Sequence, residues 1–235
     1  ASADPALEVT GIDCHIGSQI ASAEPLLEAL DSLLELAGRL KSQGIGLRHL
    51  DLGGGLGVRY NDEPDFDLET YGEALKRKLK GSGLQLVLEP GRYLVANGGV
   101  LLTRVEYLKP AAEGGRSCAI VYAGMNDLIR PALYQAWHGI EPVNPAAEDA
   151  RRDHWDIVGP VCESGDFLAH DRDLALAPGD LLAVGSAGAY GMVQSSNYNS
   201  RPRPAEVMVE NGHFRLIRRR ESSRELLALE KDLHG

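Results

Sequence analysis

The chain has 235 residues, a formal net charge of -10 and a sequence pI near 5.2, with 43% hydrophobic and 25% charged residues. This composition is typical of a globular protein with one large or two small domains. The acidic charge argues against a nucleic-acid-binding protein, which normally carries a basic face. Three cysteines without metal-ligand spacing favour a reduced cytoplasmic protein without a bound metal, and no apolar run is long enough to span a membrane.

The first part of the chain alternates strand-like and helix-like segments. These segments are, in order, a strand at 7–17, a helix at 22–44, a strand at 47–55, a helix at 67–83 and a strand at 84–91. The first helix is expected to have Ser22 as its N-cap, Pro25 in its first turn and Gly44 after its last turn. Apolar strands that alternate with helices predict a parallel sheet covered by helices. The early first strand and the lack of an initiator Met suggest a piece of a longer protein.

From about Gly98 the pattern changes to short strands between clusters of Gly, Pro, Asn and Asp. These strands are expected at 98–109, 117–124, 154–161, 180–188 and 205–219. Within the last of them, Asn211-Gly212 predicts a tight hairpin. Residues 221–233 predict a terminal helix capped by Ser222 or Ser223. A βαβαβ segment followed by a mainly β part fits either a small open sheet or the last three units of a β/α barrel.

Polar and glycine-rich residues follow each of the three expected parallel strands. They are His15-Ile16-Gly17-Ser18-Gln19, Gly53-Gly54-Gly55 and Glu89-Pro90-Gly91-Arg92. Ligands bind at the carboxyl ends of parallel strands, and successive glycines let backbone N–H groups approach an anion. A carboxylate at the end of an apolar strand needs a partner, because burying an unpaired charge is costly. Taken singly, the glycine triplet also fits a tight turn, and His15 also fits a strand-end histidine.

Six motifs occur in one order along nearly the whole chain, from Leu7 to about Arg220: "DCHIGSQ", "LDLGGGLG", "LEPGRYLVANGGVLLTRVEYLK", "AGMNDLIRPALY", "GPVCESGDFLA" and "GAYGMVQSSNYNSRPRP". Together they resemble the diaminopimelate decarboxylase family, pyridoxal-phosphate enzymes of the alanine-racemase-like (fold III) class. The resemblance implies that residues 1–96 are the C-terminal part of a (β/α)8 barrel. Residues 97–235 would be a mainly antiparallel β domain with a short terminal helix, and the enzyme would be a homodimer.

The resemblance also implies a set of site residues. Pyridoxal 5'-phosphate would be held by His15, Ser18, Gly54, Gly55, Glu89, Gly91, Arg92 and Tyr190. Glu89 would face the pyridine nitrogen and keep it protonated, so that the ring can act as an electron sink. The amino-acid substrate would contact Arg92, Arg130, Tyr134, Glu163 and Tyr190. The two arginines would hold substrate carboxylates through paired N–H contacts.

Cys162 lies beside Glu163 between turn-forming glycines. Its thiol is either reactive or an inert small side chain, whereas Cys14 and Cys118 are both expected to be inert. The resemblance implies that Cys162 is the proton donor after CO2 leaves and that Glu163 contacts the distal amino group. Both residues would act in the active site of the partner subunit. A thiol suits this role, because it can give a proton to a carbanion and regain one from solvent.

Two features depart from the family pattern. Tyr122 stands where the family often has Asp, and the Schiff-base lysine that the family carries on an early barrel strand has no counterpart. The lysines of this chain are Lys41, Lys76, Lys78, Lys80, Lys109 and Lys231. The isolated chain is therefore expected to be inactive.

The complete enzyme is expected to convert meso-diaminopimelate to L-lysine and CO2. One alternative is a sister fold III decarboxylase that acts on carboxynorspermidine, arginine or ornithine. Another is a regulatory homologue without catalytic activity.

Overall fold

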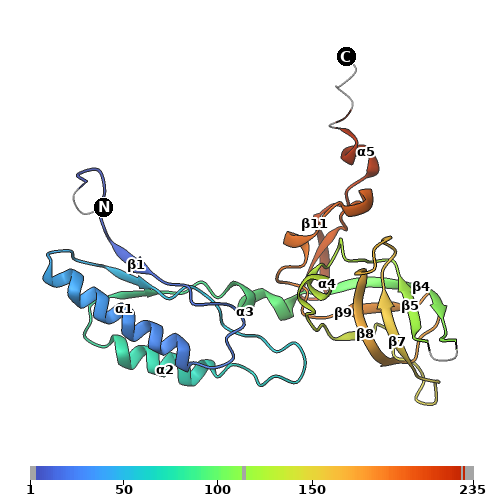
Figure 1. Cartoon of the computed structure of the whole chain (residues 1–235), viewed down its shortest axis with the longest axis horizontal. Helices are drawn as coiled ribbons and strands as arrows, with labels where there is room; N and C mark the ends of the chain where they lie inside the picture. Colours follow the sequence, from blue (N-terminus) through green and yellow to red (C-terminus); the bar gives the residue numbers. More distant parts are fainter. Residues whose placement is uncertain (1–3, 113–114, 229, 231–235) are drawn as a thin grey trace. The chain divides into compact units, whose positions relative to one another are not determined.

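The computed structural model describes residues 4–112, 115–228 and 230 (Figure 1). The chain divides into two compact units, unit 1 with residues 1–97 and unit 2 with residues 98–235. Among the described residues, no helix is both long and apolar enough to cross a lipid bilayer.

Unit 1 contains a three-stranded parallel sheet with the strand order β1-β2-β3. Its elements are β1 (Gly11–Asp13), α1 (Glu24–Ser42), β2 (His49–Asp51), α2 (Leu68–Leu79), β3 (Gln85–Val87) and α3 (Gly91–Val95). The predicted alternation of strands and helices is confirmed. The short helix α3 was not predicted, and it begins at Gly91, directly after Pro90.

Helix α1 packs through the apolar face that its sequence spacing predicts, with Leu26, Leu30, Leu33 and Ala37 buried. Gly44 follows its end with φ +81°, a conformation that glycine adopts without strain. The expected N-cap is wrong. Ala23 occupies that position, and the Ser22 side chain instead hydrogen-bonds to Glu24, which lowers the pKa of this carboxyl.

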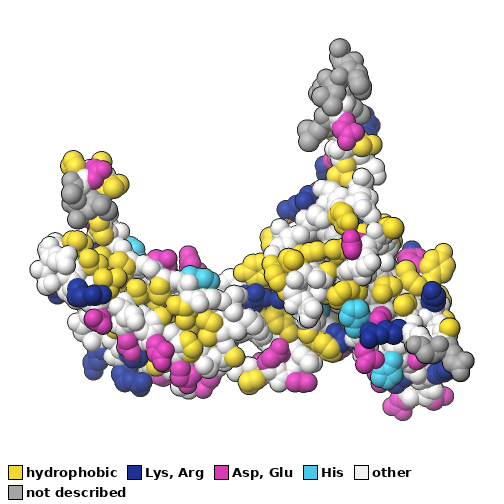
Figure 2. All heavy atoms as spheres, viewed as in Figure 1, with side chains coloured by type: hydrophobic (Ala, Val, Ile, Leu, Met, Phe, Trp, Pro, Cys, Tyr) yellow, Lys and Arg dark blue, Asp and Glu magenta, His cyan; other side chains and the backbone are white. Residues whose placement is uncertain are grey.

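Both long helices of unit 1 lie on the same face of its sheet (Figure 1). Figure 2 shows charged side chains along the side where α1 and α2 lie, and hydrophobic side chains over the adjoining sheet. Strand residues such as Ile12, Leu86 and Val87 are only half-buried. Because parallel sheets are normally covered on both faces, this half-covered sheet fits one sector of a larger β/α structure.

Unit 2 is built around a six-stranded sheet with the order β6-β9-β4-β5-β7-β8. Its strands are β4 (Leu101–Lys109), β5 (Ser117–Val121), β6 (Ile140–Pro142), β7 (Asp153–Val158), β8 (Phe167–Leu174) and β9 (Leu181–Val184), and helix α4 spans Arg130–Tyr134. All strand pairs are antiparallel except β5 and β7. The sheet encloses a core that includes Val105, Val121 and Ile157. The mainly antiparallel character of this part is confirmed.

The predicted hairpin is formed by β10 (Glu206–Glu210) and β11 (His213–Arg218). Asn211 and Gly212 have φ of 50° and 75°, as a type I′ turn requires. The terminal helix α5 (Ser223–Leu226) is capped by Ser222, one of the two predicted caps. It is shorter than the predicted span of 221–233, of which residues 229 and 231–233, including Lys231, lie outside the described residues.

Candidate active site

Three carboxylates meet at the carboxyl edge of the sheet in unit 1. Asp13 and Asp51 end β1 and β2, Glu89 follows β3, and their nearest oxygens lie within 4.8 Å of one another. Of these three, only Glu89 was predicted from the sequence. The sequence predicted that a buried Glu89 would need a partner, but Glu89 is exposed, so burial imposes no such requirement. The cluster instead concentrates negative charge, which favours a cation or a protonated nitrogen beside it.

The His15 ring is fixed against the glycine triplet that follows β2. Gly54 donates its backbone N–H to Nδ1 of His15 (3.2 Å), and Gly53 donates to the Asp51 carboxylate (2.8 Å). Since Nδ1 is an acceptor here, the neutral imidazole carries its proton on Nε2. His15 is itself exposed, so one ring edge is held while the rest of the ring is accessible for stacking.

The glycine triplet also lets the strand ends approach closely. A Cβ at Gly54 would lie 2.2 Å from the carbonyl oxygen of Glu89. At Gly55 it would lie 2.4 Å from the carbonyl oxygen of Gly17, and Gly55 has φ +92°. Both positions therefore require glycine.

Gly54→Ala is expected to lower the free energy of unfolding of the full-length protein by about 1–3 kcal/mol, because its Cβ displaces the Glu89 backbone. Gly72→Ala is the matched control, since a Cβ at this position in α2 meets nothing within 4 Å and alanine favours a helix by about 1 kcal/mol. Thermal melting measures both variants. A wild-type melting temperature for Gly54→Ala would contradict the close packing.

Arg92 joins two hydroxyl groups near the same edge. Its Nη2 donates to Ser18 Oγ (3.0 Å) and its Nη1 to the Tyr60 hydroxyl (2.6 Å). The preceding Gly91 donates its N–H to the carbonyl of Glu89 (2.8 Å). The structure thus brings together the predicted residues Ser18 and Arg92 as a cation with hydroxyl groups, which suits a phosphate. Tyr60 was missed, because a tyrosine in a loop carries no local sequence signal.

In unit 2, two loops that carry predicted site residues leave the same sheet edge. Strands β5 and β7 are parallel neighbours, with Ile120 opposite Val158. The loop after β5 leads to α4, which begins with Arg130, and the turn after β7 carries Cys162 and Glu163. Because the carboxyl ends of parallel neighbours lie side by side, these loops start next to each other.

Arg130 is buried and is held by a histidine that was not predicted from the sequence. Its Nη1 lies 2.9 Å from Nε2 of His138, which is fully buried. Nδ1 of His138 lies 2.8 Å from the carbonyl oxygen of Gly185 and must donate to it, since a carbonyl only accepts. Nε2 therefore accepts from Arg130, and the His138 ring fixes the orientation of the guanidinium. Tyr134, in the same helix as Arg130, is exposed.

Glu163 projects from an exposed turn toward the loop at residues 195–201. Its carboxylate accepts from the N–H of Gly165 (3.2 Å) and from the Tyr198 hydroxyl (3.4 Å). Tyr198 also lines a cavity of about 440 Å³ whose other lining residues are Met125, Asn126, Ile129 and Ser196. Tyr190, another predicted residue, is exposed with φ 58°.

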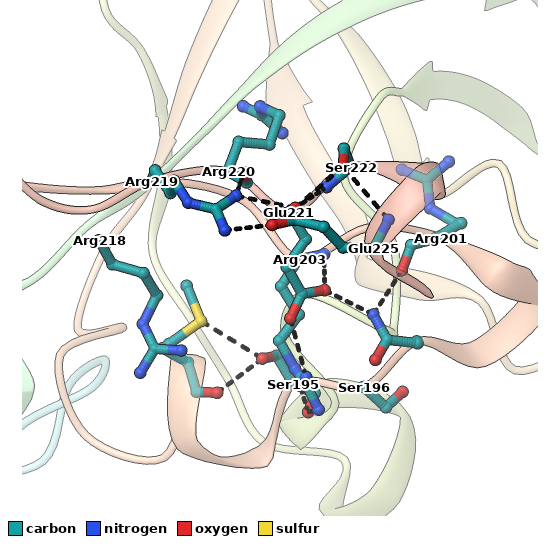
Figure 3. Close-up of polar contacts among 12 residues, drawn as sticks. Ser195, Ser196, Arg201, Arg203, Arg218, Arg219, Arg220, Glu221, Ser222 and Glu225 are labelled. Atoms are coloured by element: carbon teal, nitrogen blue, oxygen red, sulfur yellow. Dashed lines mark hydrogen bonds and ion pairs between the residues drawn. The ribbon is translucent and has the colours of Figure 1, made fainter. Parts of the chain in front are cut away.

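The loop that carries Tyr198 is tied to the segment before α5. Arg203 donates to Glu221 (3.1 Å) and to the carbonyl oxygen of Ser195 (3.2 Å), as Figure 3 shows. Glu221 also accepts from the Asn197 side chain (2.7 Å). The backbone N–H of Arg203 also donates to Glu221 (2.9 Å). This bond, together with those from the Asn197 amide and the Arg203 guanidinium, lowers the pKa of the Glu221 carboxyl, so it remains ionised as the anchor of the loop.

The three cysteines differ in accessibility. Cys14 and Cys118 are half-buried, and Cys162 is exposed. Burial raises the pKa of the Cys14 thiol, and the nearby Asp13 and Asp51 raise it further. Because the thiolate is the reactive form, these surroundings make Cys14 less reactive.

Comparison with known proteins places these features in a family. The family model for "Pyridoxal-dependent decarboxylase, C-terminal sheet domain" matches residues 18–188. Diaminopimelate decarboxylase from Pseudomonas aeruginosa is 60% identical over 222 residues, which cover 94% of this chain and 52% of that protein. The enzyme from Vibrio cholerae is 54% identical over 230 residues, covering 97% of this chain and 54% of that protein. The chain thus spans about half the length of these relatives.

Solved structures agree with these sequence matches. The crystal structure of diaminopimelate decarboxylase from Helicobacter pylori complexed with L-lysine matches with a TM-score of 0.90 at 41% identity. The match covers 96% of this chain and 55% of that one. The predicted fold class is thereby confirmed: the last β/α units of a barrel are followed by a mainly antiparallel β domain.

Proposed function

The chain belongs to the pyridoxal-dependent decarboxylases, and from this premise we propose that it forms the C-terminal part of an enzyme that converts meso-diaminopimelate to L-lysine and CO2. The observation that carries the substrate is that unit 2 supplies an arginine and a glutamate from loops that leave one sheet edge. Arg130 and the turn with Glu163 follow neighbouring parallel strands. Arg130 of one subunit and Glu163 of its partner would together suit a substrate with a carboxylate and an ammonium group at its distal end.

Unit 1 fits pyridoxal phosphate in two respects. The glycine triplet lets the ends of the three strands approach closely, next to an arginine with hydroxyl partners that suits a phosphate. The carboxylate cluster offers negative charge where a protonated ring nitrogen needs it. We therefore assign the cofactor to the predicted set His15, Ser18, Gly54, Gly55, Glu89, Gly91 and Arg92, with Tyr190 from unit 2.

The bound cofactor supplies an electron sink for the electron pair that remains when CO2 departs. Glu89 holds the proton on the ring nitrogen, and His15 stacks on the ring. Arg92 and Arg130 hold substrate carboxylates, with Tyr134 and Tyr190 beside them. These contacts orient the carboxylate that leaves and keep the distal end fixed.

Cys162 returns a proton to the carbon that has lost its carboxylate. Its exposed position lets it reach a substrate outside its own turn and regain a proton from solvent. The adjacent Glu163 binds the distal ammonium group. In the homodimer that we propose, both residues act in the active site of the partner subunit. The expected cytoplasmic location stays a prediction.

The substrate proposal is tested by measuring CO2 release and lysine formation by the full-length protein. We expect kcat/KM to be highest for meso-diaminopimelate and much lower for arginine, ornithine and carboxynorspermidine, which lack its distal amino-acid group. Preference for one of these three would contradict the substrate. If the full-length protein decarboxylates none of these four compounds, a regulatory homologue would be favoured.

A further inference from the structure

Asp166 is a buried carboxylate that the proposed mechanism does not use. It is 5% exposed. Its Oδ2 accepts the backbone N–H of Val161 (2.5 Å), and its Oδ1 accepts that of Met125 (2.6 Å). Its own carbonyl accepts from Gly159 (3.0 Å), and its N–H donates to the carbonyl of Glu163 (3.0 Å). One residue thus closes the turn after β7 and ties it to the loop after β5.

Two glycines reserve the space for this carboxylate. A Cβ at Gly159 would lie 2.4 Å from Oδ2 of Asp166, and a Cβ at Gly124 would lie 2.9 Å from Oδ1. Gly124 and Met125 begin the loop that leads to Arg130, and Gly159 begins the turn that carries Cys162. The two loops are therefore shaped around Asp166 from both sides.

We propose that Asp166 is a positioning residue of the decarboxylase, which fixes the Cys162 turn against the loop that leads to Arg130. The inference rests on the proposed function, in which the S–H bond of Cys162 breaks as a C–H bond forms at the carbon that has lost CO2. The resulting thiolate takes a proton from solvent. Because such a transfer needs the donor on one side of that carbon, the position of the turn decides the side from which the proton arrives.

Asp166→Asn tests this role with almost no change in shape. A carboxylate offers an acceptor oxygen to each N–H, whereas an amide has one oxygen and one NH2 group. No orientation of asparagine accepts from both Val161 and Met125, so one of the two ties is lost. The backbone N–H at the lost tie is expected to exchange with deuterium faster than in the wild-type protein.

The decisive measurement is decarboxylation of meso-diaminopimelate by the full-length enzyme in D2O. The wild-type enzyme is expected to place deuterium in a single configuration at the carbon that loses its carboxylate, as NMR of the lysine can show. Asp166→Asn is expected to give a mixture of configurations and a kcat lower by up to about 10²-fold, as for small misplacements of reacting groups. A loss of stability alone would leave the configuration single.

Asp180→Asn is the matched control, because Asp180 also accepts a backbone N–H, that of Ala177 (2.7 Å), but in the exposed turn between β8 and β9. It is expected to behave as wild type.

If Asp166→Asn does not fold, Gly124→Ala provides the same test, because its Cβ would crowd Oδ1 of Asp166. A single configuration at the wild-type rate, or unchanged amide exchange, would overturn the positioning role. A wild-type protein that releases no CO2 would refute the proposed function, while amide exchange would still test the two ties.

Discussion

Replacing Cys162 with alanine in the full-length enzyme is expected to lower kcat for meso-diaminopimelate by roughly 10²–10⁴-fold, the usual contribution of a positioned proton donor. Alanine cannot donate a proton, so the carbon that has lost CO2 must take one from water. KM is expected to change little, since the thiol acts after the substrate is bound. Cys162 is exposed, so the variant is also expected to melt at the wild-type temperature. Lysine formation at saturating substrate measures the effect.

Cys118→Ala is the control for this variant. Cys118 is a half-buried thiol in β5, within the sheet, and its replacement is expected to leave kcat near the wild-type value. Equal turnover by the Cys162 and Cys118 variants would remove Cys162 from the mechanism.

Mixing subunits tests whether Cys162 acts in the partner's site. A dimer of one Cys162→Ala subunit and one Glu89→Gln subunit contains one intact site only if the cysteine crosses the interface. Random mixing of the two variants should then restore roughly a quarter of the wild-type activity, because half of the dimers are mixed and each has one intact site of two. No recovery would place Cys162 in the site of its own subunit.

The sequence predicted the elements of unit 1 because their periodicity is strong. The apolar spacing of α1 is that of an amphipathic helix, and Leu26, Leu30 and Leu33 are buried accordingly. Its N-cap was mistaken because a serine near a helix start can bond to a side chain instead of the backbone, as Ser22 does with Glu24. Such a choice depends on local geometry that spacing alone does not define.

Two strands of unit 2 were missed for different physical reasons. β6 has three residues and ends in Pro142, and proline normally argues against a strand. β8 contains His170, Asp171 and Arg172 in succession, and its pairing with β7 is irregular. Asp171 has φ 53°, so the alternation of buried and exposed side chains is broken there. Only long-range pairing makes this polar segment a strand.

Motifs allowed candidate site residues to be proposed one by one, and those assignments stay predictions, but the residues that support the candidate site could not be predicted. His138 and Asp166 are buried polar residues whose contacts lie far away in sequence, at Gly185 and Met125. No local pattern distinguishes them from polar residues in surface loops. Their importance follows from burial and hydrogen bonding, which the fold alone defines.

Replacing Glu89 with glutamine is expected to lower kcat by roughly 10²–10³-fold, comparable to the loss of one preorganised electrostatic contact in other enzymes. Glutamine keeps the size of the side chain but removes its charge, so it no longer favours a proton on the ring nitrogen. Glu89 is exposed, and its replacement leaves no buried cavity. The absorbance of the bound cofactor shows whether binding persists while turnover falls.

Asp13→Asn tests whether the ring nitrogen depends on the carboxylate of Glu89 in particular or on the total negative charge of the carboxylate cluster. The carboxylate of Asp13 lies in the same cluster, with its oxygen within 4.8 Å of those of Asp51 and Glu89, so this variant removes the same charge from the neighbouring strand. We expect it to retain most of the wild-type kcat, because only Glu89 is assigned to the nitrogen itself. Equal losses in both variants would mean that the summed charge of the cluster, and not a directed contact from Glu89, keeps the ring nitrogen protonated.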